Sequence, residues 1–63
     1  MWRIIKVETI REETIPRGIR DEGGFLCFFA EPTFYHGQKE RYAEECADLR
    51  KNAEIMCAAL NNS

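Results

Sequence analysis

The residues of this chain that could do chemistry are one histidine and three cysteines. His36 lies in the segment FYHGQK, and Cys27, Cys46 and Cys57 are separated by 19 and 11 positions. A histidine that acts as a general base needs a nucleophile or an orienting carboxylate within reach. No serine lies near His36, and no cysteine sits in a recognisable nucleophile motif. We therefore predict a loop histidine and a protein that is not an enzyme.

The cysteine spacing also argues against a metal site. Structural zinc sites usually use closely spaced pairs of cysteines. Cys46 and Cys57 would lie about 16 Å apart along one helix, too far to share a metal or a disulfide. An odd number of cysteines with no secretory signal ahead of them is not typical of a disulfide framework. We predict no metal, no cofactor, reduced thiols in a cytoplasmic protein, and apolar packing for Cys46 and Cys57.

Carboxylates are concentrated in the C-terminal segment. Glu40, Glu44 and Asp48 follow one another at intervals of four, and Glu45 lies beside them. On a helix this spacing places the side chains in one ridge. One interpretation is a solvated helix face. The other is a docking surface for a basic protein groove that normally holds nucleic-acid phosphates.

The elements that position these residues follow from the periodicity of the chain. With 63 residues, 44% hydrophobic and 32% charged, it is long enough for one domain, residues 1–63. WRIIKVET is rich in β-branched residues, Ile15–Gly18 and Asp21–Gly24 are turn signals, and TFYHG is a loop or a short third strand. The predicted elements are a strand over 2–12, a strand over 24–30 and a helix over 38–61.

The predicted helix carries an apolar stripe with the spacing of a packed helix face. Its members are Tyr42, Cys46, Leu49, Ala53, Met56 and Leu60. The predicted fold class is α+β: a β-β-α arrangement in which an antiparallel hairpin packs against one long C-terminal helix. A helix of about 36 Å exceeds a six-residue strand, so we expect part of the stripe to project beyond the hairpin. The uncovered sheet surface could then hold a second copy or another protein.

The segment GGFLCFFAEP raises the question of base stacking. RNA-binding strands of the RRM type carry a basic residue ahead of their aromatic positions, and Glu22 occupies that place here. The segment therefore fits a core strand better than a stacking platform. We expect the helix to cover Phe25, Cys27 and Phe29 and to leave Leu26 and Phe28 partly available.

Two further aromatic residues, Phe34 and Tyr35, lie in the loop before the helix, where an exposed pair would serve as an interface anchor. The net charge of −2 gives no broad attraction to nucleic acid or to anionic lipid, and no window resembles a membrane span. We therefore expect no membrane association and no direct nucleic-acid binding. The opposing observation is a basic cluster in the first twenty residues: Arg3, Lys6, Arg11, Arg17 and Arg20.

The C-terminal segment AEIMCAALNNS resembles the end of many very small proteins of temperate phages and prophages. In those proteins a hairpin with a glycine turn precedes a helix with an alanine-rich end. The matching residues here are Gly23, Gly24, Ala53, Ile55, Ala58, Ala59, Leu60 and Asn61. The resemblance covers the last two-thirds of the chain and implies an accessory protein of a mobile element that acts in the host cytoplasm. It transfers no functional residue.

The leading functional hypothesis is a non-enzymatic inhibitor of the anti-CRISPR type. It would bind a host protein or ribonucleoprotein complex and occlude it. The expected partner-binding residues are Glu40, Glu44, Glu45, Asp48, Phe28, Phe34 and Tyr35. Two alternatives stay open: a homodimeric structural or regulatory module, and a nucleic-acid-binding protein that uses the N-terminal basic residues.

Overall fold

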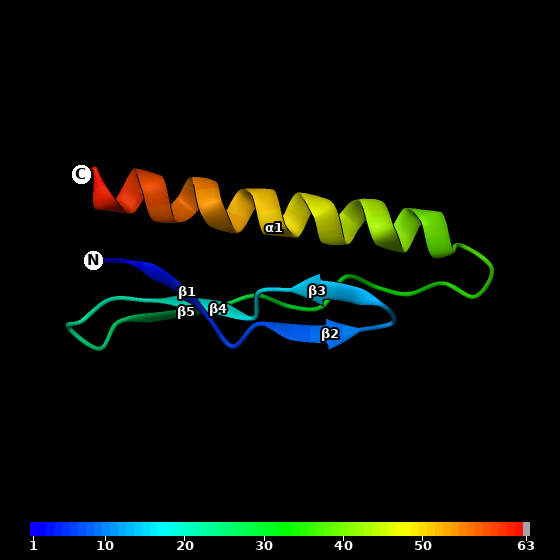
Figure 1. Ribbon diagram of the computed structural model, residues 1–63, viewed down its shortest axis with the longest axis horizontal. Coiled ribbons are helices and arrows are strands. Elements are labelled where there is room, and N and C mark those ends of the chain that lie inside the picture. The colour runs from blue at the N-terminus through cyan, green and yellow to red at the C-terminus, as the bar shows by residue number, and fades with distance from the viewer. Residues whose placement is uncertain (63) are drawn as a thin grey trace.

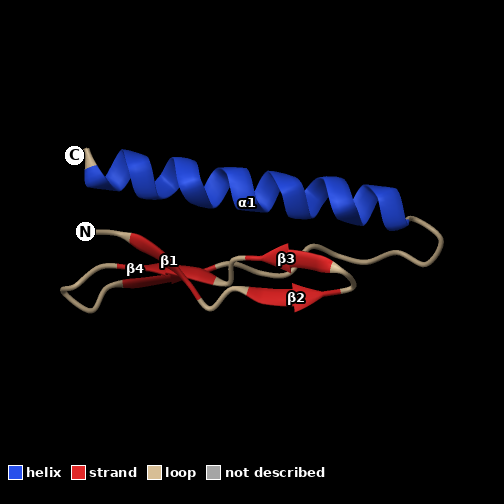
Figure 2. Cartoon of the chain, in the orientation of Figure 1, coloured by secondary structure: helices blue, strands red, loops and turns tan. Residues whose placement is uncertain are grey.

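The computed structural model describes residues 1–62 and shows one long helix lying over a single layer of strands (Figure 1). Helix α1 spans Lys39–Asn61, and all strand pairs are antiparallel. The predicted α+β class is confirmed, with five short strands in place of two (Figure 2). The strands are β1 (Arg3–Ile5), β2 (Glu8–Ile10), β3 (Glu13–Ile15), β4 (Gly18–Arg20) and β5 (Leu26–Phe28).

The first four strands form one long hairpin that is interrupted in the middle. Ile4 pairs with Ile19 and Thr9 pairs with Thr14, so β1–β4 and β2–β3 share the same register. The ladder breaks where Pro16, which has no N–H, follows β3. On the other arm Lys6 has a left-handed backbone with φ 53°. The hairpin is therefore two short sheets placed end to end.

Arg11 and Glu12 make the two-residue turn of this hairpin. Both have positive φ, 49° and 69°, as a type I′ turn requires. The strand predicted over 2–12 is therefore wrong in its extent, because it contains β1, β2 and this turn. The prediction failed here because type I′ turns usually contain asparagine or glycine, and neither stands at these positions.

Part of the second arm of the hairpin, residues 15–18, was interpreted from the sequence as a turn. Pro16 and Gly18 are typical turn residues, but Pro16 lies at the break and Gly18 begins the central strand of the three-stranded sheet. That sheet has the order β1-β4-β5. A turn over residues 21–25, closed by hydrogen bonds between Asp21 and both Gly24 and Phe25, leads into β5.

Strand β5 is shorter than the predicted 24–30, although the Phe29 N–H also donates to the Arg17 carbonyl at 2.8 Å. Residues 33–38 hold no strand, so the third strand considered for TFYHG is not there. The helix bounds agree with the prediction to one residue. The helix lies over β1, β3 and β4, and no Cα atom of β5 lies within 8 Å of a Cα atom of the helix.

The core lies between the hairpin and the helix. Ile15 packs with Tyr42 and Cys46, and Ile19 and Ala53 are also fully buried. The Arg50 guanidinium fastens the helix to β3 by donating to the Thr14 carbonyl at 2.9 Å and to the Glu13 carboxylate at 3.3 Å. Arg50 stands four residues before Glu54 on the helix, but its ion pair is with Glu13.

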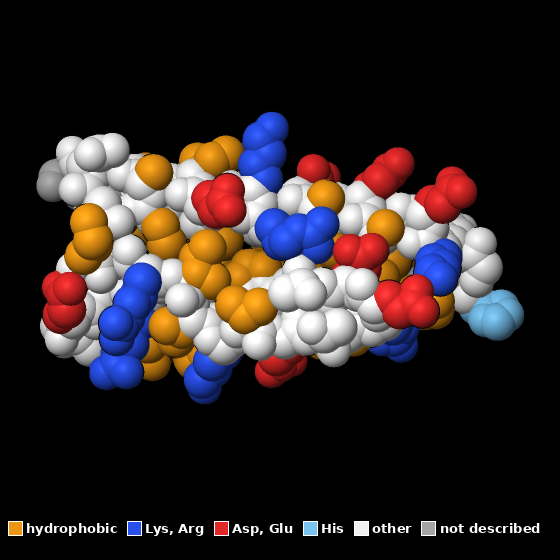
Figure 3. All heavy atoms as spheres, viewed as in Figure 1, with side chains coloured by type: hydrophobic (Ala, Val, Ile, Leu, Met, Phe, Trp, Pro, Cys, Tyr) orange, Lys and Arg blue, Asp and Glu red, His pale blue; other side chains and the backbone are white. Residues whose placement is uncertain are grey.

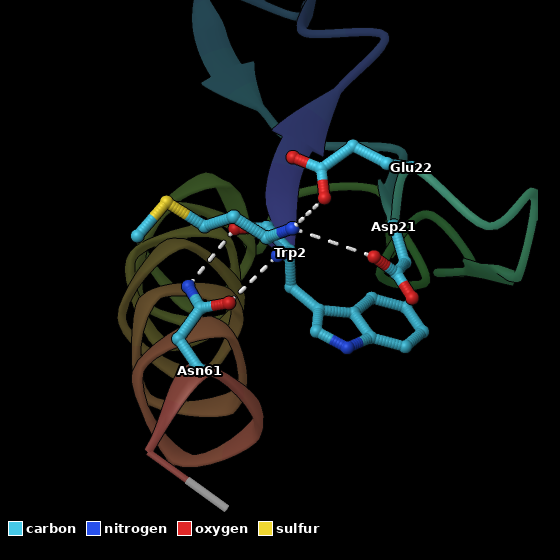
Figure 4. A network of polar contacts seen from close by, with 5 residues as sticks. Trp2, Asp21, Glu22 and Asn61 are labelled. Carbon is cyan, nitrogen blue, oxygen red and sulfur yellow. Dashed lines mark hydrogen bonds and ion pairs between the residues drawn. The ribbon is translucent and has the colours of Figure 1, made fainter.

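The far end of the helix is fastened to the first strand. The Asn61 amide accepts a hydrogen bond from the Trp2 N–H at 2.6 Å and donates to the Trp2 carbonyl at 3.1 Å (Figure 4). The Met1 amino group donates to Asp21 and Glu22 in the nearby turn. The two end-to-end sheets thus run along most of the helix, whereas we expected part of the apolar stripe to project beyond a single short hairpin (Figure 1).

Candidate functional site

The two faces of the three-stranded sheet have opposite roles. Residues that pair directly across antiparallel strands lie on the same face, and successive residues alternate between faces. Ile4, Ile19 and Cys27 form one row, and Ile19 is fully buried beneath the helix. We call this row the covered face. The other two rows form what we call the open face: Arg3, Ile5, Gly18, Arg20, Leu26 and Phe28.

The open face is basic and partly apolar. Arg3 and Arg20 are exposed and lie opposite each other on neighbouring strands. Neither is within ion-pair distance of a carboxylate in residues 1–62. The rows of the open face contain no acidic residue; the nearest acids in sequence, Asp21 and Glu22, lie in the turn beyond β4 and contact the Met1 amino group.

Lys6 adds a third cation to this face. Its Nζ lies over the Phe28 ring, 4.9 Å from the ring centroid. Strict alternation from β1 would direct residue 6 towards the helix, but its left-handed backbone at the break between the sheets ends that alternation. A lysine in this backbone region is uncommon and costs about 1–3 kcal/mol. The surrounding structure therefore holds Lys6 over Phe28 at some energetic cost.

Phe28 itself lies on the sheet with 57% of its surface exposed. A Cβ at Gly18 would stand 3.0 Å from Phe28 Cδ1 and 2.8 Å from the Cys27 carbonyl oxygen. Only glycine allows this close approach, so the absence of a side chain at Gly18 is what lets the ring lie where it does. Leu26 and Phe25 are also exposed, at 50% and 69%.

Three acidic side chains of the helix lie on the other side of the molecule. Glu40, Glu44 and Asp48, called the acidic ridge here, are exposed and make no ion pair with any residue that the structure describes. Their spacing puts them on the side of α1 opposite Tyr42 and Cys46. Figure 3 shows acidic groups, together with a basic group, projecting from the outer side of the helix, and groups of both signs on the sheet side. Glu45 differs, because Arg41 pairs with it at 3.5 Å.

The loop aromatics belong to a cluster near the helix start. Phe34 packs edge-on against Tyr42 with a centroid distance of 5.4 Å, and the Arg11 guanidinium lies 4.4 Å above the Phe34 ring. Glu31 accepts hydrogen bonds from the Tyr42 hydroxyl at 2.9 Å and from Arg11 at 3.1 Å. Burial, together with the hydrogen bond to Glu31, raises the pKa of Tyr42 to about 12. Phe34 therefore helps to join the hairpin turn to the helix.

Tyr35 is nearly half exposed, and the Arg41 guanidinium lies 5.1 Å from its ring centroid. His36 is exposed and makes no hydrogen bond with any other residue in the described part of the chain. Burial raises the pKa of the Cys46 thiol, against the opposing effect of a hydrogen bond with Tyr42, and burial also raises the pKa of Cys57. Both thiols therefore stay protonated at neutral pH.

The three cysteines are free, and within residues 1–62 no three potential metal ligands come together. The predicted apolar environment is found for Cys46, which is fully buried, and in part for Cys57.

The residues predicted to bind a partner therefore lie in three places. The acidic ridge is on the outer helix surface, Phe34 and Tyr35 are near the helix start, and Phe28 is on the open face. The helix was also expected to cover Phe25, and this is wrong because the 21–25 turn leaves that ring in solvent. Leu26 and Phe28 are available, as expected.

The sequence did contain the basic residues of the open face, but not their arrangement. Arg3 and Arg20 become neighbours only because the hairpin turns at Arg11–Glu12. Their equal distance from that turn is the signal that could have identified them. This signal was not recognised because neither Arg11 nor Glu12 is a residue typical of a type I′ turn.

No described helix has the length and apolar character needed to span a membrane. No protein-family model, curated protein or solved structure matches this chain. The functional argument below therefore rests on the surfaces of the molecule.

Proposed function

We propose that this protein is a non-enzymatic binding protein that captures a polyanionic partner on the open face of its sheet. The observation that carries the proposal is the set of three cations without carboxylate partners, Arg3, Lys6 and Arg20, placed beside an exposed aromatic ring. Unpaired cations gathered on one surface create a local positive potential even on an acidic protein. The net charge of −2 does not prevent a local excess of cations on one surface.

The same charges argue against a homodimer formed through this face. In a two-fold dimer the open face would meet a second copy of itself, because the symmetry places the same patch on both subunits. Arg3, Lys6 and Arg20 would then approach like charges, which is unfavourable in an interface. A polyanion is the complementary partner.

The absence of a catalytic role is supported by the surroundings of His36. It is exposed in the loop before α1, and no hydrogen bond links it to a cysteine or a carboxylate in the described residues. The raised pKa values of Cys46 and Cys57 are also the opposite of what a nucleophilic thiol needs.

Retention on immobilised heparin at low salt tests this function. We expect the protein to be retained despite its acidic composition, and Arg3→Gln/Arg20→Gln to elute at clearly lower salt. The matched control is Lys39→Gln/Lys51→Gln, which changes the net charge equally but removes cations from the helix. Flow-through of the wild-type protein at low salt, or equal shifts for the two variants, would contradict the proposal.

A second candidate function rests on the acidic ridge. Glu40, Glu44 and Asp48 are exposed and unpaired among the residues described, and they could enter a basic groove of a host protein or ribonucleoprotein. Together with the resemblance to small phage proteins, this supports an anti-CRISPR-type inhibitor that acts by occlusion. Tyr35 lies near the start of the same helix and would contribute hydrophobic contact.

Co-elution with purified host nucleic-acid-processing complexes tests the second candidate. Glu44→Lys/Asp48→Lys should abolish co-elution, whereas Arg3→Gln/Arg20→Gln should leave it intact. The reverse pattern would assign the interaction to the open face instead.

A further inference from the structure

We infer that the polyanion is a single-stranded nucleic acid, with a base stacked against Phe28 and its phosphates held by Lys6, Arg3 and Arg20. This inference rests on the proposed polyanion binding and names its ligand class. It combines two requirements of single-strand binding that the open face meets together: an accessible aromatic ring and a row of cations that can follow a phosphate backbone.

Phe28 has the accessibility that stacking requires. Its ring is 57% exposed, and no Cα atom of strand β5 lies within 8 Å of a Cα atom of the helix. The ring lies close to Gly18, where a Cβ would stand 3.0 Å from Phe28 Cδ1. The position of the ring is thus set by the sheet, while more than half of its surface remains free for another planar group.

Lys6 already places a positive charge at this ring, with Nζ 4.9 Å from the centroid. When a base approaches Phe28, the flexible lysine side chain can move so that its ammonium group leaves the ring and contacts the neighbouring phosphate. The left-handed backbone at Lys6 supports a functional assignment, because such conformations persist where the surrounding structure holds them and often occur at ligand sites.

Arg3 and Arg20 extend the positive charge across the sheet. They are direct cross-strand partners, and Leu26 is the next residue in the same row. The row next to it contains Ile5, Gly18 and Phe28. A strand of nucleic acid that crosses the two rows would therefore meet guanidinium groups and an aromatic ring on one continuous surface.

A single strand fits this surface better than a duplex or a membrane. In a duplex the faces of the bases are stacked on each other and are out of reach of a protein ring. If this surface bound an anionic membrane, Phe25, the most exposed of these rings, would have to enter the membrane together with the adjoining turn. That turn carries Asp21 and Glu22, and Asp21 and the Phe25 ring both lie within 4 Å of the Cβ position of Gly23. These carboxylates oppose entry into an anionic surface.

Fluorescence anisotropy with labelled probes tests the inference in about 50 mM salt. The probes are a dT 12-mer, an abasic 12-mer with the same phosphate backbone, a 12-base-pair duplex, and anionic phosphatidylserine vesicles. We expect the dT 12-mer to bind at least about 10-fold more tightly than the abasic 12-mer. The logarithm of its affinity should fall with the logarithm of salt concentration with a slope of about −2, as three phosphate contacts would give.

Variants separate stacking from charge. Phe28→Ala and Phe28→Leu should each lower dT 12-mer affinity about 10-fold and leave abasic binding unchanged. The Leu variant keeps an apolar side chain, so its result does not depend on a change in folding. Phe25→Ala is the matched control, because it removes a more exposed ring from the same segment, and we expect less than a 2-fold change. Arg3→Gln/Arg20→Gln should bring the salt slope to about −0.7.

The outcomes distinguish the two proposals. Equal binding of the dT and abasic 12-mers, a preference for the duplex, or binding to vesicles without binding to oligonucleotides would each overturn the single-strand inference. These three outcomes would leave polyanion binding in place. Failure of every polyanion, heparin included, would overturn both.

Discussion

The covered and open faces of the three-stranded sheet are built from alternate residues of the same short strands. On the covered face Ile19 is fully buried, with Ile4 and Cys27 as its cross-strand neighbours. On the open face Arg20 follows Ile19 by one residue and is exposed without an ion-pair partner in the described chain. A three-residue strand can therefore place one side chain in the core and expose the charged side chain of the next residue to solvent.

The comparison also explains how an acidic protein can present a basic surface. The carboxylates of the acidic ridge lie on the side of the helix that faces away from the core, and the cations of the open face lie on the side of the sheet that faces away from the helix. The core separates the two charged regions. Substitutions on the covered face should therefore change stability, and substitutions on the open face should change binding.

The largest expected effect is on the covered face, at Ile19. Ile19→Ala removes fully buried atoms and should lower the free energy of unfolding by about 2–5 kcal/mol, enough to unfold much of so small a protein. Urea unfolding followed by circular dichroism measures it. If the alanine variant is unfolded, Ile19→Val can be measured in its place, with an expected loss of about 1 kcal/mol in the free energy of unfolding. An alanine variant as stable as the wild type would show that the helix does not cover this face.

The next effect is expected at Gly18, which lies on the open face and yet is buried by Phe28 and β5. Gly18→Ala places a methyl group 2.8 Å from the Cys27 carbonyl oxygen, and the crowding should cost about 1–3 kcal/mol. Thermal unfolding measures the loss. In a Phe28→Ala background the loss should shrink, because the contact with the ring is gone, but it should not vanish, because the backbone contact remains.

A smaller effect on stability is expected on the helix side of the core, at Tyr42, and this effect depends on pH. The pKa of Tyr42 is raised from 10 to about 12 in the folded protein, so folding favours the neutral hydroxyl. This contribution to stability is complete below about pH 10 and is lost as the pH rises through about 12. Tyr42→Phe, which should cost about 1 kcal/mol at neutral pH, should remove this part of the alkaline destabilisation.

Alkaline unfolding curves of the wild type, Tyr42→Phe and Tyr35→Phe measure this effect. In Tyr35→Phe the remaining phenolate absorbance should titrate near pH 12. A titration near pH 10 in that variant would contradict the burial of Tyr42.

The smallest stability effect is expected on the open face. Phe28→Ala should change the free energy of unfolding by less than about 1 kcal/mol, because the ring is mostly exposed and loses only its cation–π contact with Lys6 and its packing on Gly18. The same urea titration measures it. A loss as large as that of Ile19→Ala would show that Phe28 is part of the core and would remove the division between the two faces.

Particular residues show which parts of this fold the sequence could predict. The helix was predicted to within one residue because its apolar stripe repeats over about five turns, and Tyr42, Cys46 and Ala53 of that stripe are buried as expected. The long hairpin was missed because its turn, Arg11–Glu12, lacks glycine and asparagine. Pro16 and Gly18 were interpreted as a turn, although Gly18 lies in the central strand, where the close approach of β5 requires it.

The candidate site could be predicted only in part. Phe28 and Leu26 were expected to be available, and they are. Phe34 was expected to be an exposed anchor; it is 37% exposed, and it also packs edge-on against Tyr42 and beneath Arg11. That packing depends on Glu31, which joins the hairpin turn to the helix, and local sequence does not reveal such a contact.

The sequence by itself determined the α+β class, the helix and the side of the helix that is buried, because these depend on local periodicity. The tertiary structure alone decided that Arg3, Lys6, Arg20 and Phe28 share one surface. Three elements far apart in the chain contribute to it, and only the register of the hairpin and the pairing of β5 bring them together. The physical reason is that strand pairing is non-local: two residues separated by seventeen positions become neighbours when the turn between them is fixed.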